Sequence, residues 1–152
     1  DRISFLKDLI NKTPDVKFDI YGIDKVQPIW ADHYFKTISN AKMGLNLSRG
    51  EAIKYYSSDR ITQIVGNGLV CLIDEKTKYR NFFNENEMVF YRNTNDLSEK
   101  ILKISSDDKL RKKIAKNGKI KYMKFFNSDL VSKYIIDKTL DIKSNEKYLW
   151  QK

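Results

Sequence analysis

The spacing of hydrophobic and polar residues predicts an alternation of helices and strands. Apolar residues recur at helical spacing in several stretches, which predicts helices over residues 2–12, 30–41, 58–66, 96–104, 107–126 and from 128 onward. A short helix is expected near residues 79–83. Alternating or continuous apolar residues predict strands over residues 16–21, 43–47, 69–73 and 88–91.

This order of elements predicts an α/β fold. Strands separated by helices need crossover connections, which give a mostly parallel, Rossmann-like sheet with helices on both faces and a helical C-terminus. The run from Leu69 to Ile73 is apolar without interruption, as expected for a central strand buried on both faces. Ligands of such sheets bind beyond the carboxyl ends of the strands.

The length and composition fit one domain. The chain has 152 residues, of which 41% are hydrophobic, and this is enough to form a hydrophobic core. Its first residue is Asp1 and not Met. We expect one α/β domain over residues 1–142 and a polar tail over 143–152. Cys71 is the single cysteine, which excludes an internal disulfide framework and favours a reducing, cytoplasmic location.

The net charge of +9 is concentrated in the C-terminal third. Residues 1–97 are nearly neutral, whereas the stretch from Lys109 to Lys124 holds eight basic residues and no acidic one. Such a stretch is either a solvated helix face or a surface that meets nucleic acid, an anionic bilayer or an acidic partner. One hypothesis is therefore a non-enzymatic module that binds nucleic acid or an anionic membrane through this helix.

Candidate chemistry lies in the polar loop between Ser48 and Arg60, which leaves the carboxyl end of a predicted strand and enters a helix. A helix N-terminus offers unpaired backbone N–H groups and attracts phosphate. Ser57 and Ser58 add hydroxyl donors, and Arg60 adds a forked cationic donor. Gln63 lies one turn further on the same face, where its amide can pair with a sugar hydroxyl. The alternative is ordinary capping by Ser58 with Arg60 solvated.

The same residues resemble a known family. The sequence Ser57-Ser58-Asp59-Arg60-Ile61, the helix exit at Gly66-Asn67-Gly68 and the apolar strand after it are similar to the donor-binding half of GT-B glycosyltransferases. The run from Glu87 to Tyr91 extends the likeness, as do later positions such as Asp96-Leu97, Leu110-Arg111 and Gly118. Within that class, the sequence resembles group-1 enzymes of the spore-maturation-protein type. It covers most of the chain and is clearest from Met43 to Phe126.

The resemblance implies roles for individual residues. The family's ribose-binding glutamate lies five residues before the helix-exit glycine, where this chain has Gln63. Its other glutamate, which touches the transferred sugar, corresponds to Tyr55, so both positions depart from the pattern. Ser58 matches the small residue whose backbone N–H contacts the diphosphate. Gly22, after Tyr21, matches the strand end that approaches the base.

The resemblance also implies partners. Arg49 and Asp59 complete the expected substrate-binding set, and the ligand would be a nucleotide-diphosphate sugar of the UDP or GDP type. The GT-B fold has two such halves, so we expect this chain to be the C-terminal, donor-binding half of a longer protein whose N-terminal half binds the acceptor. No catalytic base, cofactor or metal is expected here. Nucleic acid is not an expected partner, whereas peripheral contact with an anionic membrane is.

Overall fold

A three-stranded parallel sheet forms the centre of the computed structural model, which describes residues 1–48, 50–56 and 58–151. The strands are β1 (Met43–Asn46), β2 (Val70–Asp74) and β3 (Val89–Tyr91), in the order β1-β2-β3. Both pairings are parallel, and β2 lies between the other two. The predicted parallel sheet with a central strand near residues 69–73 is therefore confirmed.

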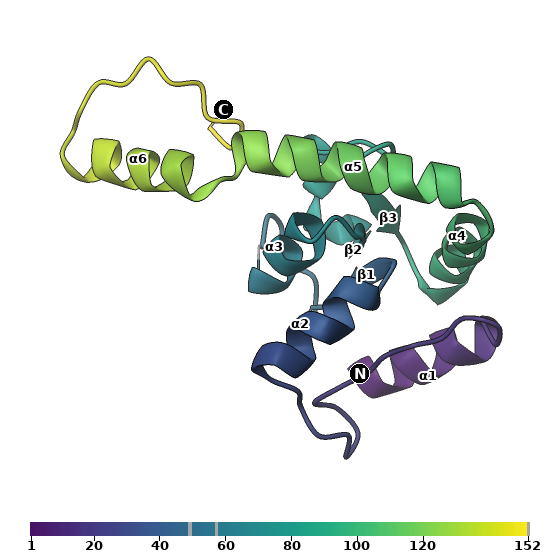
Figure 1. Ribbon diagram of the computed structural model, residues 1–152. Helices are drawn as coiled ribbons and strands as arrows, with labels where there is room; N and C mark the ends of the chain where they lie inside the picture. The colour runs from purple at the N-terminus through teal and green to yellow at the C-terminus, as the bar shows by residue number, and fades with distance from the viewer. Residues whose placement is uncertain (49, 57, 152) are drawn as a thin grey trace.

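Helices surround this sheet (Figure 1). In the described part of the chain, the α-helices are α1 (Arg2–Lys12), α2 (Ala31–Asn40), α3 (Asp59–Gly66), α4 (Thr94–Ser106), α5 (Asp108–Phe125) and α6 (Ser128–Thr139). Two short 3₁₀ turns, η1 (Glu75–Thr77) and η2 (Tyr79–Asn81), follow β2. The long helix α5 crosses the body of the molecule, and α6 continues outward beyond it.

The strands bury side chains on both faces of the sheet. On β2, Cys71 and Ile73 face a core that contains Ile61, Ile64 and Val65 of α3. Val70 and Leu72 alternate with them and face a second core built with helices α1, α4 and α5. A strand covered on both faces needs no polar alternation, which explains the continuous apolar run in the sequence.

Two glycines allow backbone segments to approach closely. A Cβ atom placed on Gly44 of β1 would lie 2.4 Å from the side chain of Ile64 in α3. A Cβ atom placed on Gly118 of α5 would lie 2.2 Å from the carbonyl oxygen of Glu87. These positions bring α3 against β1, and α5 against the segment that leads into β3.

The predicted strand over residues 16–21 is wrong. Burial does alternate there: Val16, Phe18 and Ile20 are half-buried, and the residues between them are exposed. Val16 and Phe18 pack against the second core. However, the structure shows no β-ladder in this segment, because burial periodicity reports which side chains face the core and does not supply a hydrogen-bonding partner strand.

Between the end of α6 and residue 151, where the described part of the chain ends, there is no helix or strand, but the aromatic residues are packed. The ring of Tyr148 is buried, and its centroid lies 4.9 Å from that of Tyr134 on α6. The Tyr148 hydroxyl lies 3.2 Å from Oδ2 of Asp137. Trp150 packs on Phe126, with ring centroids 5.6 Å apart. These contacts fold the C-terminal segment back over the junction between α5 and α6.

Candidate functional site

The carboxyl end of β1 meets the N-terminus of α3 through a buried asparagine. Asn46, the last residue of β1, is only 3% exposed. Its Oδ1 atom accepts a hydrogen bond from the hydroxyl of Ser58 at 3.2 Å. Ser58 occupies the N-cap position of α3, as predicted, but makes no side-chain capping hydrogen bond. The hydroxyl is directed to the strand end, so the first backbone N–H groups of α3 receive no side-chain acceptor from Ser58. The Ile61 N–H donates instead to the backbone carbonyl oxygen of Ser58 at 2.9 Å.

Arg60 ties the same helix start to the chain that leaves β1. Its Nη1 atom donates a hydrogen bond to the carbonyl oxygen of Leu47 at 2.8 Å. The side chain is exposed, and this is its one hydrogen bond to the described residues. A guanidinium carries five N–H donors, and most of those of Arg60 have no partner among the described residues, so they can bind an anionic ligand. Asp59, in the first turn, is exposed, and its negative charge interacts favourably with the positive end of the helix dipole.

Gln63 lies one helical turn after Arg60 and is half-buried. Its backbone carbonyl accepts a hydrogen bond from Nδ2 of Asn67 at 2.7 Å. Its side-chain amide makes no hydrogen bond within the described part of the chain. Gln63 is thus placed on the helix as the spacing predicted, with an amide that is available to a polar ligand.

Tyr55 joins the loop before α3 to the segment after β2. Its backbone N–H donates to the carbonyl oxygen of Thr77 at 2.8 Å, and its φ of 60° lies in the left-handed region. Its ring centroid lies 4.9 Å from that of Phe82, and Asn81 donates a hydrogen bond to its hydroxyl. A left-handed backbone at a non-glycine residue persists only where the surroundings hold it, as these contacts do.

Asp74, the last residue of β2, and Glu75, the next residue, stabilise the turns that follow the strand. Oδ1 of Asp74 accepts a hydrogen bond from the backbone N–H of Lys76 at 2.8 Å. Glu75 forms an ion pair with Arg80 at 3.0 Å. Among the residues that the structure describes, no group of three or more His, Cys, Asp and Glu side chains could hold a metal ion.

Gly22 lies in a turn of its own. Its φ is 70°, and its backbone N–H donates to the carbonyl oxygen of Val26 at 3.0 Å. The neighbouring Tyr21 ring contacts His33 of α2, with centroids 6.1 Å apart. These contacts lie within the loop and α2, whereas Ser58 and Arg60 contact the end of β1. Arg49 and Ser57, the other two predicted site residues, lie outside the described residues.

Asn46 is the site residue that the sequence reasoning missed. The signal was present: a single asparagine interrupts the apolar residues of the short strand predicted over 43–47, between Leu45 and Leu47. A polar side chain at a buried strand end needs a hydrogen-bond partner. The partner, Ser58, is twelve residues away, and only the folded topology brings the two together.

The fold agrees with the comparison to known families. The family model described as glycosyl transferase-like matches residues 2–137, and the chain therefore belongs to this glycosyl transferase-like family. No curated protein and no solved structure matches the sequence. None of the helices in the described ranges is long and apolar enough to cross a membrane.

Proposed function

We propose that this domain binds the nucleotide-diphosphate sugar donor of a glycosyltransferase. The observation that carries the proposal is the geometry at the start of α3. The Ser58 hydroxyl is directed to Asn46 and the Arg60 side chain to Leu47, so Ser58 does not cap the helix start, and Arg60 makes only one hydrogen bond to the described residues. A diphosphate is the part of the donor that suits this arrangement, because it combines negative charge with several acceptor oxygens.

We assign the remaining parts of the donor, which are the ribose, the sugar and the base, to residues near the proposed diphosphate position. Gln63 supports the ribose through a neutral hydrogen bond. The Tyr55 segment lies toward the sugar, where its ring and the nearby Lys54 ammonium, 4.9 Å from the ring centroid, offer a mixed apolar and cationic surface. Tyr21 and Gly22 are proposed to contact the base. The nucleotide would then extend from the start of α3 toward the loop that precedes α2. UDP and GDP are the nucleotides that we propose.

The acceptor belongs to a second half outside this chain. In that arrangement the catalytic base comes from the other half, and this domain supplies donor binding without a metal or a cofactor. A cytoplasmic location suits the one cysteine, Cys71, which is buried and unpaired.

The proposal is tested by titration calorimetry of UDP and GDP against three proteins: the parent, Arg60→Ala and Arg2→Ala. A charge-assisted hydrogen bond contributes about 1.5–3 kcal/mol, so Arg60→Ala should weaken binding by about ten- to a hundredfold. Arg2→Ala is the matched control, because it removes an arginine from α1, which packs against α4. It should leave the Kd unchanged.

Gln63 provides a graded second test. Gln63→Ala should cost less than Arg60→Ala, because a neutral hydrogen bond contributes about 1 kcal/mol. Gln63→Glu should tighten binding by adding charge to the ribose contact. Equal affinity of Arg60→Ala and the parent, or an equal loss in Arg2→Ala, would contradict the proposal.

A further inference from the structure

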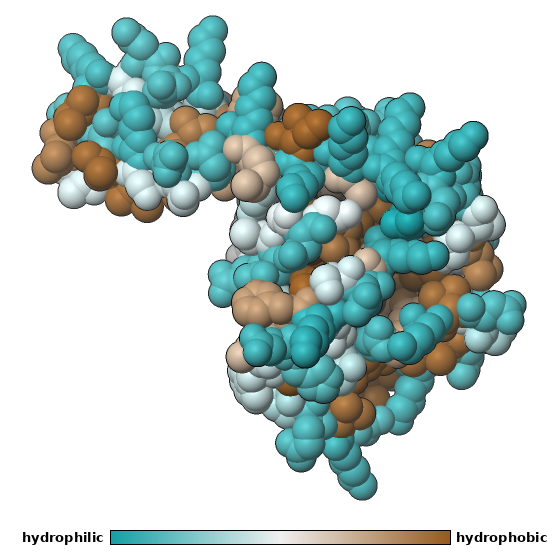
Figure 2. Space-filling view, viewed as in Figure 1, coloured by the Kyte–Doolittle hydropathy of each residue, from teal (hydrophilic) through white to brown (hydrophobic). Residues whose placement is uncertain are grey.

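The outward side of α5 is a basic surface that carries two apolar side chains. The inward side of this helix, which includes Ile114, Ala115, Gly118 and Tyr122, is buried. Helical periodicity places a set of exposed residues opposite to it: Lys109, Lys113, Lys116, Ile120, Met123 and Lys124. We call this set the α5 outer face. Figure 2 shows hydrophilic side chains over α5 with a small group of hydrophobic atoms among them.

The positive charge of the α5 outer face is not neutralised by neighbours. Within the part of the chain that the structure describes, none of its four lysines has a carboxylate within ion-pair distance. The basic residues of α5 that do form ion pairs are Arg111, Lys112 and Lys121. The face therefore presents uncompensated ammonium groups, which attract a polyanionic surface.

The apolar residues indicate which polyanion fits. Ile120 and Met123 are 56% and 53% exposed and lie one turn apart on the same side of the helix. Apolar side chains flanked by lysines suit a lipid interface, where they enter the acyl boundary while lysine stems reach up to the headgroups. A nucleic-acid backbone offers no apolar phase for them.

The arginine of this helix supports the same choice. The side chain of Arg111 is only 12% exposed and bonds to Asp108 at 3.0 Å. The α5 outer face thus has no forked guanidinium donors, which are the usual means of reading bases. Its cations are lysines, which act as point charges toward lipid phosphates.

We propose that the α5 outer face docks this protein peripherally on an anionic lipid bilayer. The lysine ammonium groups pair with lipid phosphates, and Ile120 and Met123 insert between headgroups. The inward side of α5 contacts α3, where the hydroxyl of Tyr122 lies 2.9 Å from that of Thr62. Docking therefore uses the side of α5 that faces away from α3 and does not depend on nucleotide binding.

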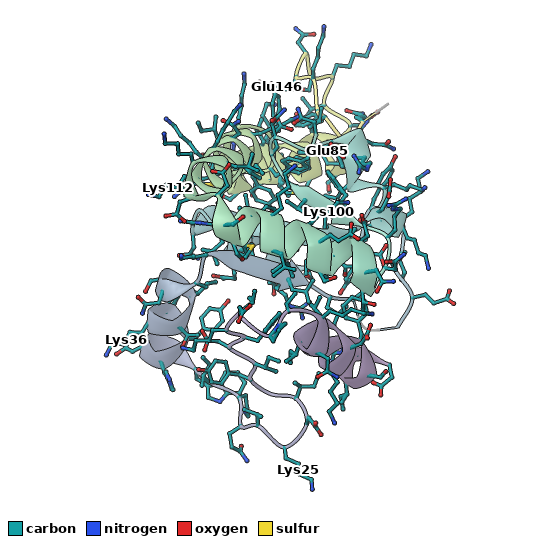
Figure 3. All side chains as sticks on the ribbon, turned by 90° about the vertical axis from the view of Figure 1, so that its right-hand side faces the viewer. Lys25, Lys36, Glu85, Lys100, Lys112 and Glu146 are labelled. Carbon is teal, nitrogen blue, oxygen red and sulfur yellow. The ribbon has the colours of Figure 1, made fainter. Side chains whose placement is uncertain are left out.

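The experiment is cosedimentation of the 152-residue chain with large vesicles of phosphatidylcholine, with and without about 30 mol% phosphatidylglycerol, an anionic lipid that attracts polybasic segments. The test variant is Lys113→Glu/Lys116→Glu. The matched control is Lys25→Glu/Lys36→Glu, which makes the same charge change at exposed lysines far from Lys112 of α5 (Figure 3). A third variant, Ile120→Ser/Met123→Ser, removes the apolar contacts and keeps every charge.

We expect the parent to bind the anionic vesicles and not the neutral ones. The α5 charge reversal should lower the partition coefficient at least tenfold, whereas the control reversal should change it less than threefold. The serine variant should reduce it severalfold. Circular dichroism confirms that each variant is folded. The proposal is overturned if the parent does not bind anionic vesicles, or if both charge-reversal variants lose binding equally. It is also overturned if a DNA duplex at equal phosphate concentration displaces the protein from the vesicles.

Discussion

Gly118→Ala tests how α5 is seated on the sheet. Gly118 is buried in the middle of α5, and an added Cβ atom would lie 2.2 Å from the carbonyl oxygen of Glu87. That oxygen belongs to the backbone just before β3, so it cannot move aside as a flexible side chain would. Relief of the clash requires a shift of the helix or of the segment that carries Glu87.

The expected cost follows from two opposing effects. Overpacking of a rigid site costs about 3 kcal/mol at the upper end of the usual range. The higher helix propensity of alanine relative to glycine offsets about 1 kcal/mol of this loss in unfolding free energy. The net loss of unfolding free energy is therefore about 2 kcal/mol, which corresponds to a fall in Tm of roughly 4–8 °C for a chain of this size.

The assay is thermal and urea unfolding followed by circular dichroism. Gly66→Ala is the matched control, since it makes the same change in a helix, at a position where an added Cβ would have nothing within 4 Å. Gly66→Ala should leave stability unchanged or raise it by up to about 1 kcal/mol. A Gly118→Ala protein as stable as the parent would refute the close approach of α5 to Glu87.

Three further perturbations follow from the structure. Burial raises the pKa of Asp96, but hydrogen bonds from neighbouring cations outweigh it and hold the pKa at about 2, below its usual 3.8. Because the folded pKa is the lower one, Asp96 stabilises the protein above about pH 4, and Asp96→Asn should cost about 1–2 kcal/mol at pH 7 in urea unfolding, a difference that vanishes toward pH 2. Burial raises the pKa of Cys71 to about 12, so a disulfide reagent at pH 8 should label it only as fast as the protein opens; immediate labelling would contradict its placement. Tyr148→Ala should cost about 2–3 kcal/mol through loss of its contacts with Tyr134 and Asp137, whereas Tyr148→Phe should cost about 1 kcal/mol; equal costs would place the stability in the hydroxyl alone.

The sequence predicts best where local pattern and burial coincide. The central strand β2 is apolar from Val70 to Ile73 because both of its faces are covered there, and the sequence pattern shows this directly. Residues 16–21 show the limit of such reasoning. Their alternation correctly indicates which side chains turn inward, but whether a ladder forms depends on a partner strand that the local sequence does not encode.

In the candidate site, too, local features were predicted from the sequence and contacts between distant segments were not. The spacing of Ser58, Arg60 and Gln63 on one helix is a local property, and the structure places all three as expected at and after the N-terminus of α3. The bond between Asn46 and Ser58 crosses from a strand to a helix and follows only from the crossover topology. The composition of residues 143–152 did not predict that Tyr148 packs on α6, because a mostly polar segment can still bury a single aromatic ring.

The most direct measurement of the central claim is a backbone amide NMR titration of the ¹⁵N-labelled chain with UDP and with GDP. Donor binding at the start of α3 predicts the largest shifts at Ser58, Asp59 and Arg60, with weaker shifts at Gln63. The N-terminus of α5, where Oδ1 of Asp107 accepts a hydrogen bond from the Leu110 N–H, serves as the internal reference, and its amide resonances should not shift. Absence of shifts with both nucleotides, or shifts of equal size at the start of α5, would contradict a donor site at α3.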